Sequence, residues 1–409
     1  MRRLWFVPMI AALPALAATV RFDPSALASL RGPHTEALQG FLDGPGDTLV
    51  IPARTGGYVT GPLHIRRSGV VVRLERGVVI RAAKGGFGGR WDCLLTMSGV
   101  EDVTLLGRGA RLVMRKGEYT EGEWRHAVKL AGVSRVHIEG LSIDSSGGDG
   151  LYIGSHAEKG GLHYSEDVSV KACHLRGHRR QGISVISVRR LLLDSLVVEG
   201  TSGTAPESGI DFEPNEPNEY LEDIVVRRSV FRGHANHAAL MWLGKLHGTS
   251  HPVSITFEDS RFAGSRGNGL YITGFRKPGL KGRIVVRRCR LEDNGSHALE
   301  ISDKPLEGPS VVVEASVLRQ GFARITPRRN TPASAIAVGW SETDWPRTGG
   351  ITITGGRIET APGVPVFRES PRRLRGIEAL TIEAYTTAGS GDVPRGVLLK
   401  RLAKDPLRR

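Results

Sequence analysis

Residues 134–154, SRVHIEGLSIDSSGGDGLYIG, contain the unit that determines the fold. The unit has a β-branched strand, a short turn, a second short strand, and a small-residue corner that leads to a third strand ending in glycine. Similar units follow at residues 165–187, 221–244, 252–274 and 282–302. A repeat of roughly 20 to 30 residues predicts a solenoid, in which each copy buries its apolar side chains against the next.

Apolar and polar residues alternate within the strands, as in Val136, His137, Ile138 and Glu139. Neighbouring side chains of a strand point to opposite faces, so stacking of the copies buries one set in a continuous core. Small residues recur at one corner, where a sharp bend favours them; these are residues 150, 182, 209, 239, 269 and 298. We therefore expect an all-β fold, a single-stranded parallel β-helix over residues 30–360.

The two ends of the chain depart from the repeat. Residues 34–42 predict a short helix that caps the N-terminal end of the solenoid. Residues 361–409 are rich in Pro, Gly and Arg, and we expect an irregular basic cap or tail there. Residues 1–18 combine a basic start, an apolar run and a small-residue site, a pattern typical of a secretory signal peptide cleaved near Ala17-Ala18.

These features predict a soluble secreted protein, periplasmic or extracellular. The N-terminal apolar run is too short to span a bilayer, and no later stretch is long enough. The three cysteines, Cys93, Cys173 and Cys289, are odd in number and lack the CxxC spacing. We expect buried thiols on strands rather than disulfides or a zinc site.

The charge balance favours an anionic partner. Lys and Arg total 56 against 42 Asp and Glu, a net charge of +14. Acidic polysaccharide, nucleic acid and anionic surfaces all fit this sign. A merely solvated basic face is the alternative, because many arginines follow strand residues, as Arg227-Arg228 and Arg287-Arg288 do.

Three segments resemble the pectin-lyase-like superfamily: GPGDTLVIPARTGGYVTGPLHI (residues 44–65), LERGVVI (74–80) and RHAVKLAGVSRVHIEGLSIDSSGGDGLYIG (125–154). The likeness is greatest to polygalacturonase-related hydrolases and pectate-lyase-like proteins, and it covers most of residues 34–303. It implies a right-handed parallel β-helix. This fold hosts lyases, hydrolases, epimerases, phage spikes and adhesins, so the function has to be argued from the site.

Equivalent positions of successive coils lie about 4.8 Å apart, so aligning the coils maps one face of the helix. The alignment places one outward column at Tyr152, Ser184, Asp211, Met241, Tyr271 and Glu300. Polar side chains gather around it, namely Asp149, Tyr152, Arg179, Arg180, Glu207, Asp211, Glu213, Asn236 and His237. Residues 201–220 are the least repetitive part of this face, and such departures from a regular repeat favour a functional site.

Asp211 is the leading catalytic candidate, because it is an outward carboxylate with Glu213 on the same face. The other catalytic candidates each have a plainer interpretation: Asp149 as a turn residue, Arg180 as surface charge and His237 as an exposed corner residue. We expect substrate contacts from Tyr152, Arg179, Glu207, Asn236, Trp242 and Tyr271.

The first functional hypothesis is a polysaccharide lyase or C5 epimerase acting on an acidic, uronate-containing chain. Arg180 or His237 would serve as the base. Asp211 and Glu213, with Asp149 and Glu207, would hold Ca²⁺, an ion that takes several oxygen ligands. Residues 209–215, GIDFEPN, loosely resemble the aspartate-bearing strand of alginate epimerases, but the histidine of that motif is absent.

The second hypothesis is an inverting glycoside hydrolase, in which two carboxyl groups lie roughly 6.5 to 9.5 Å apart. Asp149 and Asp211, two coils apart, would approach this spacing. Residues 146–150, SGGDG, resemble the Asn-Thr-Asp-Gly segment of polygalacturonases. Arg180-Gln181 stand where those enzymes have paired aspartates, and Gly177-His178 match their Gly-His-Gly segment only loosely.

The third hypothesis is a secreted adhesin or carbohydrate-binding solenoid without catalysis. Stacking of sugars on Tyr152, Tyr271 and Trp242 would then matter more than Asp211. We expect no nucleic-acid partner, because the chain carries an export signal and lacks a recognised nucleic-acid module.

Overall fold

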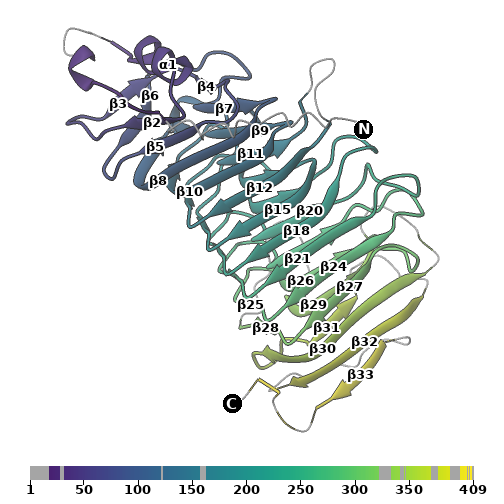
Figure 1. The fold of residues 1–409 in the computed structure, drawn as a ribbon. Coiled ribbons are helices and arrows are strands. Elements are labelled where there is room, and N and C mark those ends of the chain that lie inside the picture. Colours follow the sequence, from purple (N-terminus) through teal and green to yellow (C-terminus); the bar gives the residue numbers. More distant parts are fainter. Residues whose placement is uncertain are drawn as a thin grey trace, which may run out of the picture.

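The computed structural model of the chain is a right-handed parallel β-helix (Figure 1), which confirms the predicted fold class. The structure describes residues 18–27, 32–120, 123–156, 163–321, 333–340, 345, 347–369, 376–386, 397–402, 404 and 406–407. The predicted signal peptide, residues 1–18, lies outside this part of the chain except for Ala18, and it stays a prediction. No helix in the described ranges is long and apolar enough to cross a membrane.

Within the described residues, one sheet has 11 parallel strands stacked along the helix axis. In chain order these are β4 (Leu63–Ile65), β7 (Leu95–Ser98), β9 (Val128–Ala131), β11 (Leu151–Gly154), β14 (Gln181–Val185), β17 (Ser208–Phe212), β20 (Ala239–Trp242), β23 (Leu270–Thr273), β26 (His297–Ser302), β29 (Ser334–Gly339) and β31 (Phe367–Glu369). This 11-stranded sheet carries the third strand of each predicted unit.

The first and second strands of each unit join a larger sheet of 22 described strands. The first column has β1 (Thr19–Arg21), β2 (Thr48–Ile51), β5 (Val71–Leu74), β8 (Glu101–Val113), β10 (Ser134–Asp144), β12 (Ser165–Lys171), β15 (Val188–Asp194), β18 (Leu221–Arg227), β21 (Val253–Glu258), β24 (Gly282–Arg287), β27 (Ser310–Glu314), β30 (Thr348–Thr360), β32 (Ile377–Thr386) and β33 (Val397–Arg401). The second has β3 (Tyr58–Thr60), β6 (Val79–Ala82), β13 (His174–Arg176), β16 (Val197–Glu199), β19 (Val230–Arg232), β22 (Arg261–Ala263), β25 (Arg290–Glu292) and β28 (Val317–Gln320). The long strands β8, β10 and β30 pair in both columns and join them into one sheet.

A continuous apolar core runs the length of the solenoid between the two sheets. Inward side chains repeat from coil to coil, and Phe231 stacks on Phe262 with ring centroids 5.2 Å apart. The helix α1 (Thr35–Asp43) turns its buried residues Leu38 and Leu42 onto the first coils, which confirms the predicted N-terminal cap. Two short 3-10 turns span Pro24–Leu27 and Lys116–Glu118.

Buried histidines explain why the corner requires glycine. A Cβ atom at Gly150 or Gly209 would lie 2.5 Å from Nε2 of His178 or His234, respectively. The Nδ1 atom of His178 lies 2.8 Å from the Ser146 hydroxyl oxygen. Burial lowers the pKa of His178 to about 4 and that of His234 to about 3, so both imidazoles are neutral at physiological pH.

The alignment of the coil at residues 221–244 is wrong by one residue. Ile210 pairs with Ala239 and Asp211 with Leu240, so the corner falls at Ala238 rather than at residue 239. Met241 is therefore fully buried, and Leu240 takes its place in the outward column. A one-residue slip moves every side chain of a strand to the opposite face, and two adjacent alanines gave no signal for the register.

Strands continue beyond residue 361, where the sequence analysis predicts an irregular tail. The strand β32 pairs in parallel with β30, and β33 pairs in parallel with β32. Both extend the 22-stranded sheet at its C-terminal end (Figure 1). Alternation such as Leu380-Thr381-Ile382 is enough for a strand, although the repeat length is no longer regular.

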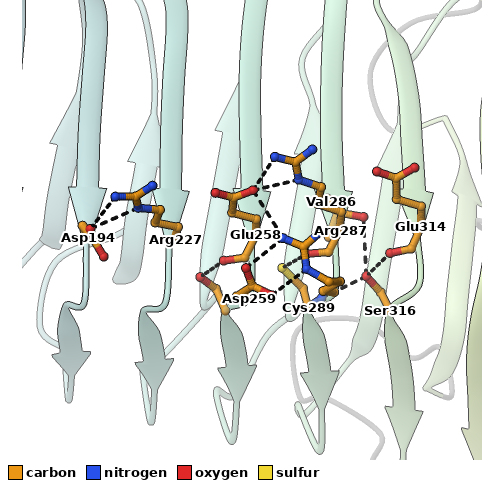
Figure 2. A network of polar contacts seen from close by, with 11 residues as sticks. Asp194, Arg227, Glu258, Asp259, Val286, Arg287, Cys289, Glu314 and Ser316 are labelled. Atoms are coloured by element: carbon orange, nitrogen blue, oxygen red, sulfur yellow. Dashed lines mark hydrogen bonds and ion pairs between the residues drawn. The ribbon is translucent and has the colours of Figure 1, made fainter. Parts of the chain in front are cut away.

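Arginines of the 22-stranded sheet pair with carboxylates on neighbouring coils (Figure 2). Arg227 donates to Asp194 with a distance of 3.0 Å between Nε and Oδ2. Arg287 donates to Glu258 at 2.7 Å, again from Nε. We call this set the charge ladder; its other pairs include Arg135–Asp102, Arg190–Asp167 and Arg288–Asp259. Many of the arginines thus pair with carboxylates between coils.

All three cysteines are free and buried, as predicted. Burial raises the pKa of Cys93 and Cys173 to about 11 and that of Cys289 to about 12, so the thiols are protonated and unreactive at neutral pH.

Candidate active site

The polar cluster predicted from the sequence lies on the outer face of the 11-stranded sheet. Strand pairing sets Lys129 beside Tyr152, Tyr152 beside Ser184, and Ser184 beside Asp211. These four residues come from β9, β11, β14 and β17. They form one row across four successive coils, with about 4.8 Å between neighbours.

Asp149 lies beneath this row and is fully buried. Its Oδ2 atom is 3.2 Å from Nδ1 of His126 and 3.7 Å from Nη1 of Arg180. Within the described residues, neither carboxylate oxygen accepts a hydrogen bond. Burial opposes the charge of Asp149, but the imidazole and the guanidinium outweigh this effect and lower its pKa. Asp149 is therefore a buried carboxylate held mainly by electrostatic attraction.

Arg180 connects this buried carboxylate to the surface. Only 12% of its side chain is exposed, and Nη2 donates to Oε2 of Glu213 at 3.1 Å. Burial works against its charge, whereas the carboxylates of Asp149, Asp211 and Glu213 raise its pKa. Arg180 is a permanent cation, so it is suited to orienting carboxylates and unsuited to removing a proton.

Asp211 and Glu213 follow each other on the outer face, yet their surroundings differ. Asp211 is 1% exposed and accepts a hydrogen bond from Nε2 of Gln181 at 2.8 Å, while its Oδ1 atom has no partner among the described residues. Burial and the negative charge of Glu213 raise the pKa of Asp211 well above its usual range. Glu213 has 32% of its side chain exposed and is bound by Arg180. The proton of the pair therefore belongs on Asp211.

Tyr152 covers the N-terminal side of this pair. Its ring stacks on that of His126, with centroids 4.8 Å apart and an interplanar angle of 21°. Burial raises the pKa of Tyr152, which keeps its phenol neutral. Lys129 lies on the preceding coil, with its Nζ atom 5.9 Å from the Tyr152 ring centroid.

Arg179 and Glu207 shape a loop next to the cluster. Glu207 accepts a hydrogen bond from the Gly203 backbone at 2.7 Å, and Arg179 donates to the Gly203 carbonyl at 3.4 Å. These contacts hold the segment between β16 and β17, the least repetitive part of the sequence. Both side chains have a structural explanation, and their role as substrate contacts stays a prediction.

The remaining predicted residues lie on later coils. His237 follows Ser208 in the corner column that contains Asp149, and its Nδ1 atom accepts a hydrogen bond from the Asn268 backbone at 3.0 Å. Its ring is 5.1 Å from that of Tyr271. Asn236 directly precedes it, and its carbonyl oxygen accepts a hydrogen bond from the Gly267 backbone. The structure thus gathers Asp149, Tyr152, Arg180, Asp211 and Glu213, and places His237 further along the helix.

Sequence reasoning missed His126, Gln181 and Lys129 as members of the site. A signal for His126 was present, because it occupies the corner position of Asp149 on the preceding coil. The sequence alignment of coils placed Gln181 in the column of Asp149, but it did not predict the hydrogen bond from Gln181 to Asp211. The contact between Gln181 and Asp211 spans two coils, so only the strand register reveals it.

The arrangement does not fit the predicted calcium site. Ca²⁺ takes about six to eight oxygen ligands. No group of three or more His, Cys, Asp and Glu residues in the described part of the chain is arranged to hold a metal ion. At Asp211 and Glu213, the guanidinium of Arg180 lies where a cation would have to bind.

No family model matches the chain. Among curated proteins, an uncharacterized protein of Bacillus subtilis (strain 168), YclG, is 29% identical over 126 residues. The match spans 28% of this chain and about a fifth, 21%, of that relative.

Solved structures share the fold over nearly the whole chain. The A-module of the Azotobacter vinelandii mannuronan C-5 epimerase AlgE6 has a TM-score of 0.60 at 12% identity, covering 91% of this chain and 97% of that one. A mutant tailspike protein of E. coli bacteriophage HK620 in complex with a pentasaccharide also scores 0.60 at 12% identity, covering 90% and 67%. The Dettilon tailspike protein scores 0.57 at 11% identity, covering 93% and 68%. At these identities the likeness shows the fold, and the reaction has to be argued from the residues of this chain.

Proposed function

We propose that this protein cleaves a polysaccharide by glycoside hydrolysis, with Asp211 and Glu213 as its acid–base pair. The observation that carries the proposal is the unequal environment of the two carboxyls. Glu213 receives a hydrogen bond from the cation Arg180, whereas Asp211 is buried and receives one from the uncharged Gln181. A carboxyl whose pKa is raised, next to one bound by a cation, can supply an acid beside a base.

Hydrolysis uses both members of the pair. Asp211 gives its proton to the glycosidic oxygen as the bond from that oxygen to the anomeric carbon breaks. The Glu213 carboxylate takes a proton from the water whose oxygen forms the new bond to the same carbon. One proton is given and one is taken, so the pair returns to its starting charge after a proton shift between the two groups.

The neighbouring groups position this pair. Asp149 lies 3.7 Å from the guanidinium that binds Glu213, so it holds that cation in place. We assign Asp149 and Arg180 as positioning residues for this reason. The substrate class is supported by the shared fold, because the epimerase is named for the polysaccharide mannuronan and the HK620 tailspike protein was solved with an oligosaccharide.

A second reaction is favoured by one specific observation. Two cations, Lys129 and Arg180, lie on either side of Tyr152 in the row of strands, and a neutral phenol between them could return a proton to a sugar ring. Proton abstraction from a uronate, leading to β-elimination or C5 epimerisation, needs this kind of charge neutralisation. Tyr152 lies two strand spacings from Asp211 along the same row, so the same face would serve.

The test is an assay of the protein on acidic and neutral polysaccharides that follows reducing ends and the ultraviolet absorbance of unsaturated products. We expect new reducing ends without unsaturated product. Asp211→Asn and Glu213→Gln should each lower turnover by about 10² to 10⁴-fold, because each removes one half of the acid–base pair.

Glu222→Gln is the matched control, since its side chain is 33% exposed and lies on the following coil, in the 22-stranded sheet. It should keep full turnover. If unsaturated product forms together with reducing ends, the reaction is β-elimination rather than hydrolysis. Binding without any product would favour the carbohydrate-binding solenoid, and normal turnover in Asp211→Asn would refute the site.

A further inference from the structure

Two tryptophans and two cations form an exposed patch at the N-terminal side of the site. We call Arg90, Trp91, Trp124 and Lys129 the tryptophan platform. Trp91 is 58% exposed. Among the described residues, Trp91 and Leu398 are the two exposed large hydrophobic side chains. The rings of Trp91 and Trp124 meet edge to face, with centroids 4.1 Å apart. A solvent-exposed pair of this size points to a binding surface.

Both cations of the platform lie against aromatic rings. The Cζ atom of Arg90 is 4.0 Å from the ring centroid of Trp124 and 5.5 Å from that of Trp91. The Nζ atom of Lys129 is 5.1 Å from the centroid of Trp91. Positive charge is therefore held beside flat apolar surface, where it can meet an anionic group of a ligand.

Hydrogen bonds hold the two loops of the platform in place. The Asp92 carboxylate accepts from the Gly89 backbone at 2.6 Å and closes the turn that presents Trp91. Arg125 follows Trp124 in the chain, and its Nε atom donates to the Phe87 carbonyl at 3.0 Å. The second loop is thereby tied to the first, so the platform is organised before any ligand binds.

The platform continues the row of the candidate active site. Lys129 pairs with Tyr152, and two further strand spacings lead to Asp211, which makes about 14 Å in all. On the other side of the acidic pair, Trp242 lies on the next coil after β17, with the Cζ atom of Arg276 5.0 Å from its ring centroid. Aromatic rings with attached cations therefore flank Asp211 and Glu213 along the helix axis.

We propose that the tryptophan platform is a subsite for an anionic sugar of an acidic polysaccharide, whose chain runs along the helix axis over Tyr152 to the acidic pair. The sugar ring packs on Trp91, and its carboxylate pairs with Lys129 and Arg90. The inference rests on the proposed function in one respect, namely that the bound chain reaches Asp211 and Glu213. It assigns the substrate as an acidic chain that lies across the strands.

Binding without turnover tests the platform. The Asp211→Asn protein is titrated with alginate, polygalacturonate and hyaluronate, and with carboxyl-reduced polygalacturonate as the neutral counterpart, by affinity electrophoresis. We expect at least one acidic polymer to bind and the reduced polymer to bind far less. Adding Trp91→Ala should weaken that binding about tenfold, as loss of a central aromatic contact does. Adding Lys129→Met should weaken it about fivefold and reduce its dependence on salt.

Leu398→Ala is the control for the loss of an exposed apolar side chain, and Trp91→Phe keeps an aromatic ring in case Trp91→Ala lowers stability. The inference is overturned if none of the acidic polymers binds, if the reduced polymer binds as well as the acidic one, or if Trp91→Ala and Lys129→Met leave affinity unchanged. If the tryptophan platform passes these binding tests but the protein cuts no polymer, the subsite stands and only the proposed hydrolysis is refuted.

Discussion

The charge ladder and the candidate active site use the same residue types on two faces of one solenoid. On the ladder, Arg288 and Asp259 are about half exposed and make a paired contact at 2.7 Å. In the site, Asp149 is fully buried, and its carboxylate accepts no hydrogen bond in the described contacts, although His126 and Arg180 are nearby. The exposed charges are paired in solvent, whereas a buried carboxylate without hydrogen bonds is typical of a functional site.

The largest contrast is expected from removing one arginine on each face. Arg180→Met removes one of the two cationic partners of the buried Asp149 carboxylate, so we expect a loss of about 3 to 5 kcal/mol in the free energy of unfolding. Turnover should fall by about a hundredfold, because Glu213 loses the cation that orients its carboxylate. Urea unfolding and the pH dependence of kcat measure the two effects.

Arg288→Met is the matched variant on the ladder. Its guanidinium is 51% exposed, so solvent replaces the lost contact and the unfolding midpoint should stay at the wild-type value. Equal destabilisation by Arg180→Met and Arg288→Met would show that the buried arginine contributes no more to stability than the exposed one.

The second-largest effect is expected from acid, which lowers the free energy of unfolding by protonating the buried histidines. The folded-state pKa of His178 is about 4, below the ordinary value of about 6.5. Between these values the unfolded chain binds more protons, so the free energy of unfolding falls as the pH drops from about 6.5 to 4, by up to about 3 kcal/mol. His178→Asn should flatten this slope, since Asn294 occupies the same interior column. An unchanged slope in thermal melts would show that His178 is not the group that titrates.

The smallest effect is that of Asp211, and its dependence on pH is opposite to that of the histidines. The folded-state pKa of Asp211 is raised, so the folded chain binds more protons than the unfolded chain above the ordinary carboxyl pKa, and stability falls as the pH rises. Asp211→Asn removes this penalty, and we expect its Tm to exceed the wild-type Tm by a few degrees at pH 8 and by less at pH 5. A lower Tm for Asp211→Asn at both values would show that this carboxyl stabilises the fold.

Much of the fold was predictable because one short unit repeats. Alternation within each strand, the corner glycines and the N-terminal helix were all visible in the sequence, and the structure confirms the β-helix they predict. The prediction was wrong at Ala238 and Ala239, where two small residues in succession leave the register of one coil undecided. Residues 361–409 were expected to be irregular because they are rich in Pro, Gly and Arg, yet β32 and β33 extend the sheet.

The sequence by itself determined the repeat, the buried core and the presence of Asp211 and Glu213 on one outward strand face, because these depend on spacing within a single coil. Only the tertiary structure decided which charges are buried and which partners they meet. His126 lies 23 residues from Asp149, and Arg180 lies 33 residues from Glu213. Contacts between coils depend on the register of strands and on loops of differing length, and burial, which shifts the pKa values, exists only once the coils have stacked.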